Sequence, residues 1–70
     1  MSLRTKSAAL LPPKVIAEHL SMSIDFIYTE IQSENLHAIK VGREWRVSTD
    51  EAVRYLGTLQ APVPVEWMGR

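Results

Sequence analysis

The stretch AIKVGREWRV, residues 38–47, decides the fold of this chain, because here the hydrophobic pattern changes to a period of two. Ile39 and Val41 alternate with polar residues before a glycine, and Trp45 and Val47 do so after it. Alternation of this kind around a glycine is typical of two β-strands joined by a short connection. The stretch therefore predicts a β-hairpin.

The register of this hairpin follows from where its apolar side chains fall. A two-residue turn would mix polar and apolar side chains on both faces of the hairpin. A three-residue connection, residues 42–44, pairs Val41 with Trp45 and Ile39 with Val47, and so keeps one face apolar. We therefore predict the three-residue connection.

This predicted register places basic side chains together on the outer face of the hairpin. Lys40 lies opposite Arg46, and Arg43 lies at the tip. Like charges directly opposite each other destabilise a bare hairpin. A phosphate bound between them would remove that penalty, whereas the alternative is an ordinary solvated face.

Two helices are predicted before the hairpin. Pro13 suits the first turn of a helix, and the apolar spacing that follows predicts a helix over residues 13–20. Ser23 suits an N-cap, and Ile27 and Ile31 lie one helical turn apart, which predicts a second helix over residues 23–34 with that side buried. Tyr28 falls at the boundary, and the solvent side carries Asp25, Thr29, Gln32 and Ser33.

A third helix is predicted after the hairpin. Ser48 with Glu51 three residues later is typical of a capping box, and an apolar stripe follows over residues 49–56. Gly57 is expected to end this helix.

Residues 60–70 are predicted to form an extended, non-helical tail, because prolines alternate with valines there. Trp67 is an isolated large hydrophobic residue beyond them. One interpretation makes Val63, Val65 and Trp67 a contact for a partner, since tryptophan is a frequent interface anchor. The alternative is that Trp67 folds back onto its own small core.

Length and composition favour a binding module over an enzyme. Seventy residues make one small domain, and eight basic residues balance eight acidic ones. The chain has no cysteine, and His19 and His37 are too far from other ligands to indicate a metal site. We expect no catalytic site, cofactor, metal or small-molecule substrate. Without a long apolar stretch we also expect no membrane association and a cytoplasmic location.

Two helices, a hairpin and a helix are the order of a winged helix-turn-helix, an α+β fold that is mainly α with a small β-hairpin. We assign it to residues 10–59, after a basic arm over residues 1–9. Residues 10–56 resemble the excisionase family of MerR-like helix-turn-helix proteins. The resemblance is carried by LLPP at 10–13, IAE at 16–18, Leu20, Ser23, Ile27, Tyr28, Ile31 and KVGREWRV at 40–47.

The resemblance implies a DNA-binding protein, either an excisionase-like recombination factor or a small transcriptional regulator of a phage or mobile element. In that family the tyrosine-bearing helix enters the major groove and the wing contacts the DNA backbone or the adjoining minor groove. By position, the helix would present Ser23, Asp25, Tyr28, Thr29 and Gln32 to double-stranded DNA. The wing would present Lys40, Arg43 and Arg46, and the protein would be nucleoid-associated when bound.

The charge of the second helix leaves other functions open. Residues 14–34 carry net −3, whereas residues 35–47 carry net +2. Because phosphate contacts dominate affinity for DNA, we expect further copies or an integrase to supply the remaining affinity. The alternatives are a protein-interaction adaptor on a winged-helix scaffold and the DNA-binding part of a phage packaging protein.

Overall fold

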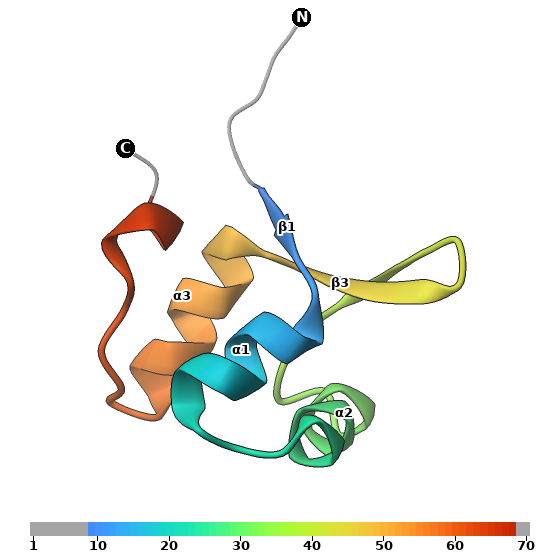
Figure 1. The fold of residues 1–70 in the computed structure, drawn as a ribbon, viewed down its shortest axis with the longest axis horizontal. Helices are drawn as coiled ribbons and strands as arrows, with labels where there is room; N and C mark the ends of the chain where they lie inside the picture. Colours follow the sequence, from blue (N-terminus) through green and yellow to red (C-terminus); the bar gives the residue numbers. More distant parts are fainter. Residues whose placement is uncertain (1–8, 69–70) are drawn as a thin grey trace, which may run out of the picture.

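The computed structural model describes residues 9–68, which form an α+β fold with three α-helices and a three-stranded antiparallel sheet (Figure 1). The strand order is β1-β3-β2. None of the helices over these residues has the length and apolar character to cross a membrane. The elements in chain order are β1 (Leu10–Leu11), α1 (Pro13–Leu20), α2 (Ile24–Gln32), β2 (Ile39–Val41), β3 (Glu44–Ser48), α3 (Thr49–Thr58) and the 3-10 turn η2 (Val65–Trp67).

The local signals that predicted the helices are confirmed at their N-termini. Pro13 opens α1, and the Ser23 and Ser48 hydroxyls accept hydrogen bonds of 3.1 Å from the N–H groups of Phe26 and Glu51. Each serine therefore satisfies an N–H that has no partner within its helix.

α1 ends at Leu20 as predicted, whereas the C-termini of α2 and α3 differ from the predictions. α2 ends at Gln32, two residues before the predicted end, and α3 continues through Gly57 to Thr58. Gln60, with φ of 56°, takes the left-handed conformation expected of Gly57, and the next N–H bonds back to the Leu56 carbonyl at 3.0 Å. Burial of Leu56 holds this last turn, so the modest cost of a helical glycine is tolerated.

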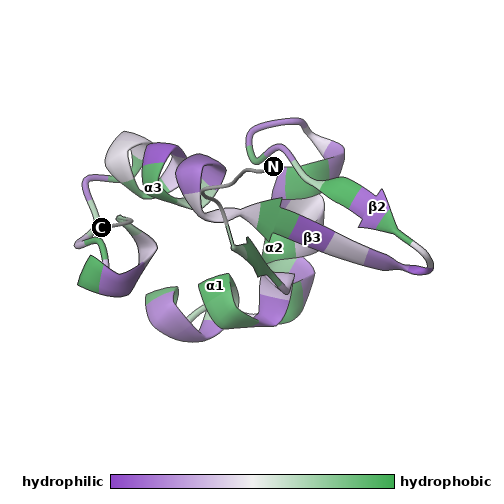
Figure 2. Ribbon diagram, turned by 90° about the horizontal axis from the view of Figure 1, so that it is seen from above, coloured by the Kyte–Doolittle hydropathy of each residue, from purple (hydrophilic) through white to green (hydrophobic). Residues whose placement is uncertain are grey.

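The core lies between one face of the sheet and the helices. It combines apolar residues that every helix and β3 contribute, so no single pair of elements could bury it alone. Figure 2 shows the hydrophobic residues of these elements in green, with polar residues on their other sides. The fully or almost fully buried residues are Ile16, Ala17, Ile27, Ile31, Leu36, Val47, Ala52, Tyr55, Leu56 and Trp67.

The predicted hairpin register is wrong. The pairs are Val41 with Glu44, Lys40 with Trp45, and Ile39 with Arg46, so the turn has two residues rather than three. Gly42 has a φ of 63°, and no positive φ is found at the residue after it, which matches the hairpin turn with glycine at its first central position. The hairpin extends beyond the helices (Figure 1). Placing all of its apolar side chains on one face would therefore have buried little additional apolar surface.

Strand β1 was not predicted, because two residues before a proline are too few to show a period. Leu10 pairs with Ser48 and Leu11 with Val47, and the Thr49 N–H donates to the Ala9 carbonyl at 3.0 Å. The start of the predicted domain thus belongs to the sheet. Of the predicted basic arm, residues 1–8 lie outside the described residues.

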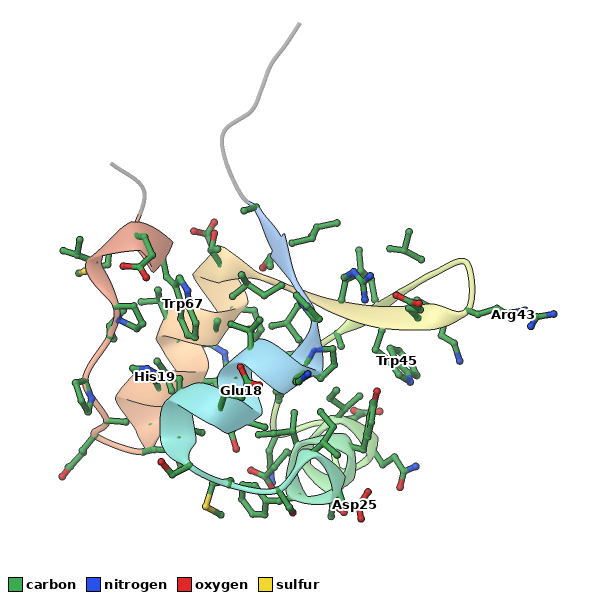
Figure 3. All side chains as sticks on the ribbon, in the orientation of Figure 1. Glu18, His19, Asp25, Arg43, Trp45 and Trp67 are labelled. Atoms are coloured by element: carbon green, nitrogen blue, oxygen red, sulfur yellow. The ribbon has the colours of Figure 1, made fainter. Side chains whose placement is uncertain are left out.

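The proline-rich tail docks on the domain, and it includes one 3-10 turn where no helix was predicted. Trp67 is only 6% exposed, and its ring centroid lies 5.3 Å from that of His19 on α1 (Figure 3). The His19 imidazole also lies within hydrogen-bond distance of the Pro62 carbonyl, with Nε2 2.7 Å from the oxygen. Trp67 therefore folds back onto the core of its own domain, which was the alternative to a partner contact.

Glu51 joins α3 to the segment before the hairpin instead of completing a capping box. Its carboxylate accepts hydrogen bonds from the His37 N–H at 2.9 Å and from the Arg54 guanidinium, whose Nε is 2.8 Å away. The Arg54 hydrogen bond, with help from the His37 N–H, lowers the pKa of Glu51 against the opposing effect of burial.

We predict that Trp67→Ala lowers the free energy of unfolding by about 3–5 kcal/mol, because it empties a buried aromatic site. Val65→Ala is the matched control, since Val65 lies in the same turn but is 78% exposed. Urea denaturation should show a much lower midpoint for the first variant only. Equal midpoints for the two variants would mean that the tail does not stabilise the domain.

We also predict that Glu51 contributes to acid sensitivity. Because its pKa is lower in the folded chain than in the unfolded chain, its stabilisation is present above the unfolded pKa and is lost as pH falls through the folded pKa. Glu51→Gln should therefore lose less free energy of unfolding between pH 7 and pH 3 than the wild type. Asp50→Asn, an exposed change in the same helical turn, is the control, and an identical loss in both variants would contradict the prediction.

Candidate nucleic-acid interface

A groove of about 610 Å³ lies between α2 and the hairpin. It brings together residues that are far apart in the sequence and that were predicted to act together, namely Tyr28 of the helix and Arg43 and Arg46 of the hairpin. The start of α1 closes one side of the groove. The lining residues are Pro12, Pro13, Lys14, Ile24, Tyr28, Arg43, Glu44, Trp45 and Arg46.

The predicted residues of α2 divide into a groove residue and an outward-facing set. Tyr28 lines the groove with 38% of its surface exposed, whereas the other four are exposed and do not line it. Figure 3 shows Asp25 pointing away from the domain. The outward-facing set is Ser23, Asp25, Thr29 and Gln32.

Two of these outward side chains already have partners within the helix. The Ser23 hydroxyl accepts the capping hydrogen bond from Phe26, and the Thr29 hydroxyl donates to the Asp25 carbonyl at 3.0 Å. For Asp25 and Gln32, the structure of residues 9–68 gives no side-chain hydrogen bond. These two are therefore the most available for a ligand.

The three basic residues of the hairpin are not arranged as predicted. Lys40 and Arg46 are on opposite faces, because Lys40 pairs with Trp45 and neighbouring residues of a strand point to opposite sides. The Lys40 ammonium lies 4.7 Å from the centroid of the Trp45 ring, a cation–π contact. The repulsion expected between Lys40 and Arg46 therefore does not exist.

Arg46 is largely occupied by its own hairpin. Its Nη2 bonds to the Glu44 carboxylate at 2.5 Å, and its Nη1 donates to the Trp45 carbonyl at 2.8 Å. Arg43, by contrast, extends from the exposed tip of the hairpin (Figure 3). Arg43 and Lys40 are therefore the hairpin cations better placed to meet an anion.

Sequence reasoning missed the contribution of α1 to the groove. Lys14 lines it, and its ammonium is 3.9 Å from the Glu18 carboxylate, with both side chains well exposed. No sequence period links α1 to a hairpin 30 residues later, so only the tertiary packing could reveal this. Trp45, which the sequence placed on the apolar face of the hairpin, packs against the core and lines the groove as well.

The groove has an apolar floor with charges around it. Its lining includes two prolines, an isoleucine, a tyrosine and a tryptophan, together with three basic side chains and only one carboxylate, that of Glu44. Because Glu44 is paired with Arg46, the remaining local charge is positive. Such a surface suits a ligand that carries negative charge and flat apolar parts.

The predicted tail contacts are distributed differently. Val65 is exposed, Val63 is half-buried against the core and Trp67 is buried, so they do not form one continuous surface. Within residues 9–68, no group of three or more His, Cys, Asp or Glu side chains could hold a metal ion.

Comparisons with models of protein families, with curated proteins and with solved structures find no match to this chain.

Proposed function

We propose that this protein is a sequence-specific DNA-binding protein with a winged helix-turn-helix. In this proposal α2 enters the major groove, and the β2–β3 hairpin is the wing, which contacts the adjoining backbone. The supporting observation is the groove that gathers Tyr28 of α2, Lys14 of α1 and Arg43 of the hairpin. A phosphate chain passing between α2 and the wing would meet both cations and the tyrosine hydroxyl.

The outward-facing side of α2 would carry the sequence preference. Gln32 can donate to and accept from the edge of an adenine, the usual bidentate partner of a glutamine. Thr29 would support a neighbouring contact. Asp25 would repel phosphates and so reduce binding at sites where no base contact compensates.

The wing would act mainly through Arg43 and Lys40. Both are exposed, and neither is paired with a carboxylate within residues 9–68. Arg46 would add less, because moving it to a phosphate requires breaking its bond to Glu44. This ranking differs from the equal roles that the sequence suggested.

The resemblance to the excisionase family favours an excisionase-like recombination factor or a small transcriptional regulator. With two exposed wing cations and a helix that carries acidic residues, one copy has few phosphate contacts. We therefore propose that further copies or an integrase add affinity.

A protein-interaction adaptor is the second candidate. It is favoured by α2 itself, which contains Asp25 and Glu30 and no basic residue. Titration with genomic DNA fragments at about 50 and 200 mM salt separates the two functions. Binding that weakens steeply with salt supports the DNA-binding protein, and no binding at the lower salt supports the adaptor.

We predict that Arg43→Ala weakens binding to all DNA sequences alike and lowers the slope of log affinity against log salt by about 0.9, the value for one lost phosphate contact. Arg46→Ala is the matched control, since it removes the same charge from a side chain already paired with Glu44. Fluorescence anisotropy measures both effects. An unchanged slope for Arg43→Ala would remove the wing from the interface.

For α2 we predict separate effects of two neighbouring side chains. Gln32→Ala should flatten the preference at one base pair, with about 1–3 kcal/mol of discrimination lost. Asp25→Asn should instead raise affinity for random DNA, because it removes a carboxylate that the DNA phosphates repel. Selection of bound sequences from a random pool measures both. Identical preferred sites of identical strength in both variants would contradict the assignment.

A further inference from the structure

We propose that two copies of this chain associate through the side of the sheet that the helices leave uncovered. We call it the outer sheet face. It consists of Leu10, Ile39, Val41, Glu44, Arg46 and Ser48, which follow from the register and from the alternation of side chains along each strand. This proposal does not depend on DNA binding, because it concerns the association of two copies in the absence of DNA; Glu44 and Arg46 also line the edge of the groove, whereas Ile39, Val41 and Leu10 do not.

The first observation is an apolar surface that the domain itself does not cover. Leu10, Ile39 and Val41 are 46%, 55% and 49% exposed. They come from both edge strands and flank the central strand β3. In Figure 2, β2 is coloured green at its two ends and purple at Lys40 between them.

These exposures follow from the two-residue turn. A three-residue connection would have put Ile39 and Val41 on the same face as Trp45 and Val47. The observed register turns them outward instead. Covering these two exposed β-branched side chains with another surface would lower the free energy, because it removes apolar area from water.

The second observation identifies the covering surface, because the outer sheet face is complementary to itself. Arg46 lies beside Ile39, and Glu44 lies beside Val41, as two successive rows across β3 and β2. A two-fold axis that lies in the interface, perpendicular to β3 and level with Trp45, exchanges these rows. Arg46 of one copy then meets Glu44 of the other.

The same axis matches the two aliphatic residues of β2, whereas Leu10 lies farther along the sheet, opposite Ser48. The axis stacks Ile39 of one copy on Val41 of the other, so charge pairing and apolar contact are satisfied by one arrangement. An isologous interface requires this correspondence, in which residue i contacts j and j contacts i. The existing Glu44–Arg46 bond within one copy becomes part of a ring of four alternating charges.

Association by strand edges fits less well. β2 has three residues, and antiparallel pairing with its copy about the central residue would set Lys40 against Lys40. A short edge strand with a lysine is a common protection against such pairing. Face-to-face packing avoids this contact.

The test is a pair of charge reversals examined by sedimentation velocity over a concentration series. Because the outer sheet face is small, we expect weak association of the wild type. Glu44→Arg alone and Arg46→Glu alone should each be monomeric, since like charges then meet across the axis. An equimolar mixture of the two variants should form a heterodimer at least tenfold tighter than either variant with itself.

Lys14→Glu and Glu18→Lys are the matched controls, because they reverse an exposed ion pair on α1 that is not part of the outer sheet face. Each should associate as the wild type does, and mixing them should change nothing. Circular dichroism checks that every variant is folded. A monomeric wild type at 1 mM, or a mixture of the Glu44 and Arg46 variants that stays monomeric, would overturn the proposal.

A second measurement uses the unmodified protein. Backbone NMR shifts recorded between low and high concentration should move at Ile39 and Val41 and stay constant in α2. Concentration-dependent shifts confined to α2 or to the tail would place self-association elsewhere and reject the outer sheet face. Failure of this proposal leaves the DNA titration unaffected, since that titration measures DNA binding by the unmodified protein and not self-association.

Discussion

Burial of Val47 in the central strand β3 is the constraint on which the rest of this small structure depends. Val47 is fully buried, pairs with Leu11 of β1 and belongs to the same core as α1 and α3. The strand runs directly into α3, whose first turn is capped by Ser48, so the position of Val47 also fixes where that helix begins. A rigid strand-to-helix junction of this kind limits the freedom of both elements.

The outer part of the hairpin is not held by burial in the core. Beyond Trp45, toward the tip, the strands leave the core, and turn geometry decides the register there instead of burial. The two-residue turn then gives the hairpin two distinct faces. One face carries Lys40 and Trp45 toward α2, and the other carries the aliphatic and paired charged residues of the outer sheet face.

These two faces connect the proposals about function. A domain with few cations at its groove would bind DNA weakly as one copy, and association through the outer sheet face would add the contacts of a second copy. The tail offers a different kind of contribution. Trp67 packs between α1 and α3, near His19. Its role is to enlarge the hydrophobic core, which is small in a domain of this length.

The sequence by itself determined the helices and the existence of the hairpin, because their signals are local. Ser23 and Ser48 set helix starts by accepting hydrogen bonds from N–H groups three residues later, and Pro13 does so through its fixed φ, and the structure reproduces those starts. The helix ends were less predictable, since Gly57 stays helical when Leu56 beside it is buried.

Only the tertiary structure decided the register, β1, the docking of Trp67 and the composition of the groove. The predicted register placed all apolar side chains of the hairpin on one face. That arrangement stabilises a hairpin only where a core covers the face, and the hairpin tip extends past the core. Strand β1 and the place of Lys14 in the groove depend on contacts between segments about 30 residues or more apart. Such contacts leave no period in the sequence, because their free energy comes from packing between elements rather than within one.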